Sequence, residues 1–190
     1  MLCGIDEAGR GPIAGPLVVA GVIIKKEIKE LNDSKILSEK KREALFPEII
    51  KNSTYHIVFT SAKTIDEKGL STCLKNSINE IMIKLSKDAN EFLMDGNTSF
   101  GIQTLRHKIK ADATVQEVSA ASILAKVSRD RYMYEISKKY PVYNFNKHKG
   151  YGTKAHTELI KEYGRCKEHR FTFKLKALGE DMQGIQKSLF

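Results

Sequence analysis

Four acidic residues of this sequence have the type and the spacing that metal chemistry requires. Asp6 and Glu7 stand side by side after a short apolar stretch, and Asp95 and Asp112 each follow a later predicted strand. In open α/β sheets, ligands bind beyond the carboxyl ends of the strands. Carboxylates that converge there raise one another's pKa unless cations lie between them. Because oxygen-only ligands suit Mg²⁺ or Mn²⁺ and are wrong for zinc, we expect a site for one of these two ions.

Such a site would favour phosphate hydrolysis. Two divalent ions roughly 3.5–4 Å apart can hold an attacking water and a leaving oxygen on one phosphate. The residues alone leave other interpretations open. Asp6 and Glu7 could belong to a surface turn with solvated charges, and Asp112 could cap a helix or stand in a turn. Further acids compete for the same role, namely Asp33, Asp88 and Asp130.

The glycine-rich stretch after the first two acids indicates a turn that a ligand can approach closely. Strand side chains alternate between faces, so Glu7 reaches the same point as Asp6 only if the strand 2–6 ends there and the backbone turns. The sequence Gly9-Arg10-Gly11 permits such a turn and leaves the backbone nearly bare. We expect Arg10 to meet phosphate or sugar.

The composition is typical of a globular protein with a polyanionic partner. The chain has 190 residues, 41% of them hydrophobic, which suits one domain or one domain with a small appendage. The formal net charge of +9 and the pI of about 9.4 favour nucleic acid first and a membrane surface second. No apolar run approaches the roughly 20 residues that span a bilayer, and the start lacks the basic region of a signal peptide. We therefore expect a cytoplasmic protein without a membrane partner.

The metal-binding side chains other than carboxylates show no ligand pattern. Cys3, Cys73 and Cys166 are far apart, odd in number, and form neither a C-x-x-C motif nor a zinc spacing. We interpret them as ordinary thiols in a reducing compartment. The five histidines have no paired ligand spacing, and we interpret them as surface or core residues.

The hydrophobic pattern predicts an α/β fold, with helices packed around a sheet. Strands are expected at residues 2–6, 17–24, 55–60, 91–94 and 104–110, the first two as an antiparallel hairpin. Helices are expected at residues 38–52, 64–85, 119–138 and 153–163, with a basic, aromatic loop at 142–152. Ser38, Thr64 and Thr153 are the expected N-caps, and Pro47 should kink or shorten the first helix.

Several motifs resemble those of the ribonuclease HII family, in the same order from residue 2 to about residue 173. They are Gly4-Ile5-Asp6-Glu7-Ala8-Gly9-Arg10-Gly11-Pro12, Asn32-Asp33-Ser34-Lys35, Met94-Asp95-Gly96, Lys110-Ala111-Asp112, Ser119-Ala120-Ala121-Ser122-Ile123-Leu124-Ala125-Lys126-Val127 with Arg129-Asp130-Arg131, and Lys149-Gly150-Tyr151-Gly152-Thr153. The chain departs from the family pattern at Ile36, Met94 and Ala111, where every charged ligand is kept, and in the looser match His169-Arg170-Phe171-Thr172-Phe173.

The resemblance implies a fold and an activity. The fold would be a ribonuclease H-like mixed sheet flanked by helices, with a catalytic domain at 1–164 and a small, helical C-terminal appendage and tail at 165–190. The activity would be endonucleolytic cutting of the RNA strand in RNA–DNA hybrids and cutting at ribonucleotides embedded in duplex DNA. Two-metal-ion chemistry would leave 5′-phosphate and 3′-hydroxyl ends. The residues alone also admit a basic binding module without catalysis and a DNA-junction nuclease.

The resemblance also assigns roles to individual residues. The family's catalytic and metal-binding acids fall on Asp6, Glu7, Asp95 and Asp112. The Gly9-Arg10-Gly11 turn matches the segment that reads the ribose 2′-hydroxyl, which is the group that distinguishes RNA from DNA. Tyr151 matches the aromatic residue that packs on the neighbouring deoxyribose, and Lys35 matches a phosphate contact. Without the resemblance, we would interpret Tyr151 as a loop aromatic that fills a gap.

The last five residues suggest a protein partner. Gln186–Phe190 is similar to the pentapeptide that binds the bacterial sliding clamp, with Lys187 as a departure. A terminal Leu-Phe pair is an apolar anchor of the kind that occupies pockets. The alternative is a tail that packs on its own domain or frays.

We expect the protein to act as a monomer.

Overall fold

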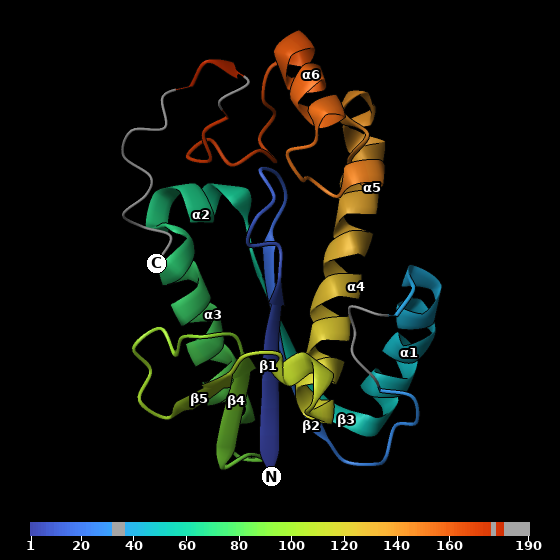
Figure 1. Cartoon of the computed structure of the whole chain (residues 1–190), viewed down its shortest axis with the longest axis vertical. Coiled ribbons are helices and arrows are strands. Elements are labelled where there is room, and N and C mark those ends of the chain that lie inside the picture. Colours follow the sequence, from blue (N-terminus) through green and yellow to red (C-terminus); the bar gives the residue numbers. More distant parts are fainter. Residues whose placement is uncertain (32–36, 176–177, 181–190) are drawn as a thin grey trace. The chain divides into compact units, whose positions relative to one another are not determined.

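The computed structural model of the chain describes residues 1–31, 37–175 and 178–180 (Figure 1). The predicted phosphate contact Lys35 and the pentapeptide Gln186–Phe190 lie outside the described residues. In chain order the elements are β1 (Leu2–Ala8), β2 (Leu17–Ile24), α1 (Glu39–Asn52), β3 (Ser53–Thr60), α2 (Ala62–Lys68), α3 (Leu70–Leu85), β4 (Glu91–Asp95), β5 (Leu105–Lys108), η1 (Ala111–Ala113), α4 (Gln116–Lys139), η2 (Pro141–Tyr143), α5 (Phe145–His148) and α6 (Lys154–Tyr163).

The strands of the described residues form one mixed sheet in the order β3-β2-β1-β4-β5. β1 pairs with β2 in the antiparallel direction, which confirms the predicted hairpin, and with β4 in the parallel direction. β4 and β5 are also parallel. A mixed sheet flanked by helices confirms the predicted fold class.

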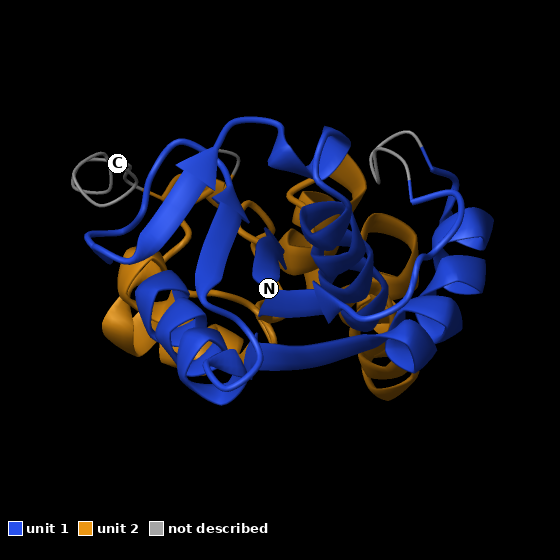
Figure 2. Ribbon diagram, turned by 90° about the horizontal axis from the view of Figure 1, so that it is seen from below, with its two compact units in different colours: residues 1–8, 18–59, 74–128 blue, residues 9–17, 60–73, 129–190 orange. Residues whose placement is uncertain are grey.

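Contacts within the chain divide it into two compact units, which Figure 2 colours separately. Unit 1 contains residues 1–8, 18–59 and 74–128, and unit 2 contains residues 9–17, 60–73 and 129–190. These units differ from the predicted domains 1–164 and 165–190. The domain boundary between residues 164 and 165 stays a prediction. In unit 2, the α-helices after residue 139 that the structure describes are α5 and α6, and no α-helix begins between residues 165 and 175.

Two glycines let the sheet of unit 1 lie directly against helices. A Cβ on Gly4 of β1 would come within 2.2 Å of the backbone carbon of Glu117 in α4. A Cβ on Gly21 of β2 would come within 2.2 Å of Ile81 Cγ2 in α3. On the α4 side, one core contains buried residues of β2, α1 and α4, including Val18, Leu45 and Leu124. Because β2 is covered on both faces, its apolar run is continuous.

The structure confirms the predicted bounds of β2 and the predicted caps of α1 and α6. β2 has the predicted bounds, and every residue of it but the last is buried. Ser38 caps α1 by accepting from the amide of Lys41. Thr153 caps α6 in the same way through the amide of His156, and Gly164 ends that helix.

The single helix predicted at 64–85 is wrong, because the chain forms two helices there. Gly69 has a φ of 79° and donates its amide to the Ile65 carbonyl, which ends α2. This left-handed backbone costs glycine little and other residues more. α2 also begins earlier than predicted, with Ser61 rather than Thr64 as its N-cap.

Other boundaries differ from the prediction. β1 continues to Ala8, because Glu7 and Ala8 pair with Val19 and Val18 of β2. Pro47 does not shorten α1, which runs to Asn52. Pro47 has no backbone N–H to donate to the carbonyl four residues earlier. It lies on the exposed side of the helix, where water can donate to that carbonyl instead. The predicted loop at 142–152 contains the short helix α5 and most of η2.

Candidate active site

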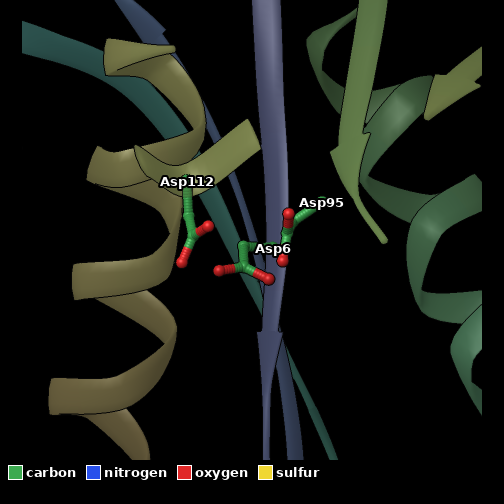
Figure 3. A group of neighbouring side chains, drawn as sticks. All are labelled: Asp6, Asp95 and Asp112. Carbon is green, nitrogen blue, oxygen red and sulfur yellow. The ribbon is translucent and has the colours of Figure 1, made fainter. Parts of the chain in front are cut away.

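Three of the four predicted acids lie together in unit 1. One carboxylate oxygen each from Asp6, Asp95 and Asp112 lies within 4.8 Å of the others, and Figure 3 shows the three side chains pointing toward one another. Asp6 is 6% exposed and Asp112 is 1% exposed, whereas Asp95 is half-buried. Residues from three distant segments of the sequence therefore form one carboxylate cluster.

The parallel pairing of β1 and β4 places the first two acids. Ile5 pairs with Met94, so Asp6 and Asp95 follow at the next step of both strands. Parallel strands end at the same edge of a sheet, which is where ligands of α/β proteins bind. The prediction that these two acids converge rests on that rule, and the structure has this geometry.

Asp95 in turn positions Asp112. The backbone amide of Ala111 donates a hydrogen bond to Asp95 Oδ1 at 2.8 Å. Lys110 adopts the left-handed conformation with a φ of 58°, and the chain then enters η1, which carries Asp112. Asp112 therefore lies in a buried 3-10 turn four residues beyond β5, and not at the end of a strand as predicted.

Asp6 faces the helix α4. It shares a strand face with Gly4, which lies against Glu117 at the start of that helix. One turn further along α4, the Ser122 side chain hydrogen bonds to the Asp6 carboxylate. The amide of Glu7 also donates to Asp6 Oδ1 at 2.8 Å. These contacts fix the orientation of a carboxylate that is almost completely buried.

The environment of Asp6 disfavours a bare negative charge. Burial raises its pKa well above the usual range, and the neighbouring charges of Glu7 and Asp95 raise it further, against the lowering effect of the Ser122 hydrogen bond. A divalent cation among the carboxylates would remove this penalty. The donors are oxygen atoms only and lie close enough to share an ion, so the residues present fit Mg²⁺ or Mn²⁺.

Glu7 lies outside the group of three acids. β1 runs through Glu7 to Ala8 without turning, and the Oε2 atom of Glu7 is buried. The turn that was expected to bring both side chains to one point is absent at this position. The charge of Glu7 still acts on Asp6. Its role as a ligand remains a prediction.

The predicted sugar-reading residues lie in unit 2. Gly9 has a φ of 97°, and a Cβ there would come within 2.4 Å of Arg129 Nε. A Cβ on Gly11 would meet only the Tyr151 ring, at 4.0 Å. Gly9 is thus required by the fold, whereas Gly11 leaves open space beside Tyr151, a residue that is 47% exposed.

Two buried arginines, to which the sequence motifs assign no role, hold this turn. Arg170 donates to the carbonyls of Gly9, Arg10 and Gly15, at 2.6, 3.1 and 3.0 Å. Arg129 donates to the carbonyls of Pro16 and Ala14 at 3.0 and 3.1 Å, and its guanidinium lies 5.9 Å from the centre of the Tyr151 ring. Burial lowers the pKa of Arg170 to about 9, and repulsion from Arg129 contributes to this shift.

The cysteines lie apart from this chemistry. All three are free, as the sequence analysis expects. Burial raises the pKa of the Cys3 thiol to about 12, which makes it a poor nucleophile. Among the described residues, no helix has both the length and the apolar character needed to cross a membrane.

Known proteins resemble this chain along almost all of its length. The family model described as Ribonuclease HII matches residues 3–176. Ribonuclease HII of Aliarcobacter butzleri is 70% identical over 189 residues, covering 100% of this chain and 98% of that protein. Ribonuclease HII of Sulfurovum sp. is 54% identical over 94% of each.

Solved structures agree with this result. The ribonuclease HII in a PCNA complex from Archaeoglobus fulgidus matches with a TM-score of 0.79 and 30% identity, over 92% of this chain and 96% of that one. Ribonuclease H2 from Pyrococcus horikoshii matches with a TM-score of 0.74 and 30% identity, over 91% and 93%.

The fold is therefore that of the ribonuclease H-like nucleases, which are metal-dependent hydrolases. Within this class, the chain belongs to the ribonuclease HII family. Members of this family bind RNA–DNA substrates, degrade the RNA in the hybrids and depend on a divalent metal. The resemblance stated from the motifs is thereby confirmed.

Proposed function

We propose that this protein is an endonuclease that cuts both the RNA strand of RNA–DNA hybrids and single ribonucleotides embedded in duplex DNA. Hydrolysis leaves 5′-phosphate and 3′-hydroxyl ends. The observation that carries the proposal is the cluster of Asp6, Asp95 and Asp112, whose oxygen atoms lie within 4.8 Å of one another. The net charge of +9 supports a nucleic acid as the substrate.

Asp6, Asp95 and Asp112 are the proposed ligands of two Mn²⁺ or Mg²⁺ ions, with Glu7 as a further ligand. When bound, such ions supply positive charge that acidifies water and stabilises the charge that develops on a phosphate. The carboxylates contribute a set of acceptors of which Asp6 and Asp112 are buried and Asp95 is half-buried. Ser122 and the amides of Glu7 and Ala111 keep the oxygens of Asp6 and Asp95 in place before any ligand arrives.

Recognition of the ribonucleotide is assigned to unit 2. Gly9, Arg10 and Gly11 present a nearly bare backbone to the ribose 2′-hydroxyl, and Tyr151 packs on the deoxyribose that follows. The open space at Gly11 and the exposed ring of Tyr151, 4.0 Å from its Cβ position, support this assignment. Lys35 is the proposed phosphate contact. A ribose at the position of the second sugar would place its 2′-hydroxyl against the ring.

The protein is also proposed to bind a sliding clamp through Gln186–Phe190, as a monomer in the cytoplasm. The Archaeoglobus fulgidus ribonuclease HII was solved in a complex with PCNA, which supports a clamp partner for this relative. The three free cysteines fit a reducing compartment. The clamp affinity of the full chain should exceed that of a chain truncated after residue 185, and equal affinities would reject this partner.

A cleavage assay tests the activity. The substrates are a DNA duplex with one ribonucleotide, a uniform RNA–DNA hybrid and a branched DNA junction, each with and without Mn²⁺ or Mg²⁺. We expect metal-dependent cutting of the first two, with a 5′-phosphate on the product. Cutting of the junction alone would identify a junction nuclease instead, and binding without cutting would identify a non-catalytic module.

A further inference from the structure

A buried pair of histidines connects the C-terminal segment to Tyr151. The backbone amide of Cys166 donates to His169 Nδ1 at 2.9 Å. His169 Nε2 lies 3.1 Å from His156 Nε2, and His156 Nδ1 lies 2.9 Å from the Tyr151 carbonyl oxygen. His156 is 0% exposed and His169 is 1% exposed. We name the path from His169 through His156 to the Tyr151 carbonyl the histidine relay.

The partners at the two ends of the relay fix its protons independently. The Cys166 amide already carries a hydrogen toward His169 Nδ1, so that nitrogen accepts and His169 Nε2 carries the proton. The Tyr151 carbonyl can only accept, so His156 Nδ1 carries a proton and His156 Nε2 accepts. Both ends therefore require the same hydrogen bond between the two rings, in which His169 Nε2 donates to His156 Nε2. The Cys166 carbonyl, 3.2 Å from His169 Nδ1, does not receive a proton in this arrangement.

A third histidine and a phenylalanine enclose the relay. The ring of His148 stacks on that of His156 with their centres 4.0 Å apart. The amide of Gly150 donates to His148 Nδ1 at 3.2 Å, so His148 Nε2 donates to the Tyr143 carbonyl at 2.7 Å. The buried ring of Phe145 packs against all three histidines. The backbone on both sides of Tyr151 is thus held by neutral imidazoles.

Arg170, the neighbour of His169, holds the glycine turn instead. Its guanidinium donates to the carbonyls of Gly9 and Arg10, and its amide donates to the Ile13 carbonyl at 2.8 Å. The amide of Ile13 in turn donates to the Gly150 carbonyl at 2.9 Å. His169 is therefore linked through His156 to the Tyr151 carbonyl, whereas Arg170 bonds directly to the Gly9–Gly11 turn.

We propose that His156, His169 and Arg170 are positioning residues that set the register between the Gly9–Gly11 turn and Tyr151, and so select a ribose followed by a deoxyribose. This inference rests on the proposed roles of Gly9–Gly11 and Tyr151. A junction is recognised only if both sugar contacts are made together. A uniform hybrid offers no deoxyribose in the cut strand and depends less on the placement of Tyr151.

The test measures kcat/KM on two substrates of one sequence, a DNA duplex with a single ribonucleotide and a uniform RNA–DNA hybrid. The readout is their ratio. His156→Asn keeps an N–H near the position of Nδ1, whereas His156→Gln places its amide near Nε2 and loses the donor to Tyr151. We expect the ratio to fall about tenfold in the Gln variant and to stay within about threefold of the unmodified protein in the Asn variant.

Three further variants complete the design. Arg170→Lys keeps the charge but cannot form three bonds with a fixed fork, so it should also lower the ratio. His56→Gln alters a histidine of β3, which hydrogen bonds to Glu80, and should leave the ratio unchanged. Tyr151→Ala removes the ring itself and should lower the ratio at least as far as His156→Gln does.

The outcomes separate this inference from the proposed function. If Tyr151→Ala lowers the ratio and His156→Gln does not, the relay has no positioning role and only this inference is overturned. Equal losses in the Asn and Gln variants would show a merely structural role and would also overturn it. If Tyr151→Ala leaves the ratio unchanged, the proposed role of Tyr151 fails and the inference fails with it.

The protonation of the two histidines can also be measured directly on the unmodified protein, so this test does not depend on whether a variant folds. Nitrogen–proton correlation spectra of the histidine rings at pH 7 report which nitrogen carries the proton. We expect the Nδ1–H tautomer at His156 and the Nε2–H tautomer at His169. A proton on His156 Nε2, or a doubly protonated ring at either residue, would contradict the relay.

Discussion

The amide of Ala111 donates a hydrogen bond to Asp95 Oδ1 at 2.8 Å, and this one contact ties the end of β4 to the turn that carries Asp112. Asp95 thus serves two purposes in the metal-free protein. One of its oxygens organises the backbone of η1, and its charge contributes to the raised pKa of Asp6. The carboxylate cluster is therefore preorganised by backbone contacts, although its members repel one another.

Asp6→Asn should make the metal-free protein more stable while it abolishes cleavage. The amide removes a buried charge that Glu7 and Asp95 repel, so we expect the free energy of unfolding to rise by about 1 kcal/mol. Cleavage should fall about a thousandfold or more. Urea unfolding in the presence of a chelator measures the first effect, and a single-ribonucleotide duplex measures the second. A stable variant with normal cleavage would defeat the assignment of Asp6.

Gly9→Ala and Gly11→Ala should differ in what they damage. A Cβ on Gly9 meets Arg129 at 2.4 Å and the Pro16 carbonyl oxygen at 2.6 Å, at a positive φ, so this variant should lose about 2 kcal/mol of stability. A Cβ on Gly11 meets nothing closer than 4.0 Å, so that variant should unfold like the unmodified protein.

Gly11→Ala should nevertheless cut the single-ribonucleotide duplex at least about tenfold more slowly, because the methyl group would occupy the space assigned to the sugar. Thermal unfolding and cleavage of both glycine variants are compared side by side. Normal cleavage by Gly11→Ala would show that the ribose is not read there.

Arg170→Met should destabilise the protein by about 3 kcal/mol. The guanidinium serves the carbonyls of Gly9, Arg10 and Gly15, and each buried acceptor that loses its donor costs roughly 1–3 kcal/mol before relaxation. Arg106→Met changes an exposed arginine that pairs with Glu91 on the neighbouring strand and should cost less than about 1 kcal/mol. Chemical denaturation gives both values, and equal costs would contradict the role of Arg170 as the anchor of the turn.

The sequence predicts most of this fold where the signals are local. The apolar run of β2 and the caps Ser38, Thr153 and Gly164 act between near neighbours in the chain, and the structure confirms them. The acids could be placed because parallel strands end at one edge. The sequence does not predict that Gly69 separates two helices, because the apolar residues of α3 begin directly after it at helical spacing.

The arginines and the relay could not be predicted, because their partners are remote. Arg170 Nη2 bonds to a carbonyl 161 residues away, and Arg129 Nε bonds to one 113 residues away. Five histidines without ligand spacing carry no signal of such bonds. Arg170 and His169 do stand in the motif that matches the family only loosely, and Arg129 stands in a closer match, but neither motif indicates which carbonyls these side chains bind.

The stability of the protein should fall as the pH drops from about 6.5 to about 4. Burial is the main cause that lowers the pKa of His156 to about 3 and that of His169 to about 4. An unfolded histidine has a pKa near 6.5, so in this window the unfolded chain binds more protons. Each residue then adds a slope of about 1.4 kcal/mol per pH unit. The charged and titratable groups around the rings are His148, Tyr143, Cys166 and Arg165.

Urea unfolding of the unmodified protein and of His156→Gln between pH 4.5 and 7.5 isolates this effect, since the contributions of the carboxylates cancel in the comparison. The curve of the variant should be flatter by the slope of one histidine. Parallel curves would show that His156 titrates normally in the folded protein.

The most direct test of the account is a crystal of the protein soaked in Mn²⁺, with anomalous diffraction recorded at the manganese edge. We predict manganese bonded to the carboxylate oxygens of Asp6, Asp95 and Asp112, which lie within 4.8 Å of one another before the metal is added. A map with these three side chains in place and no manganese between them would contradict the central claim.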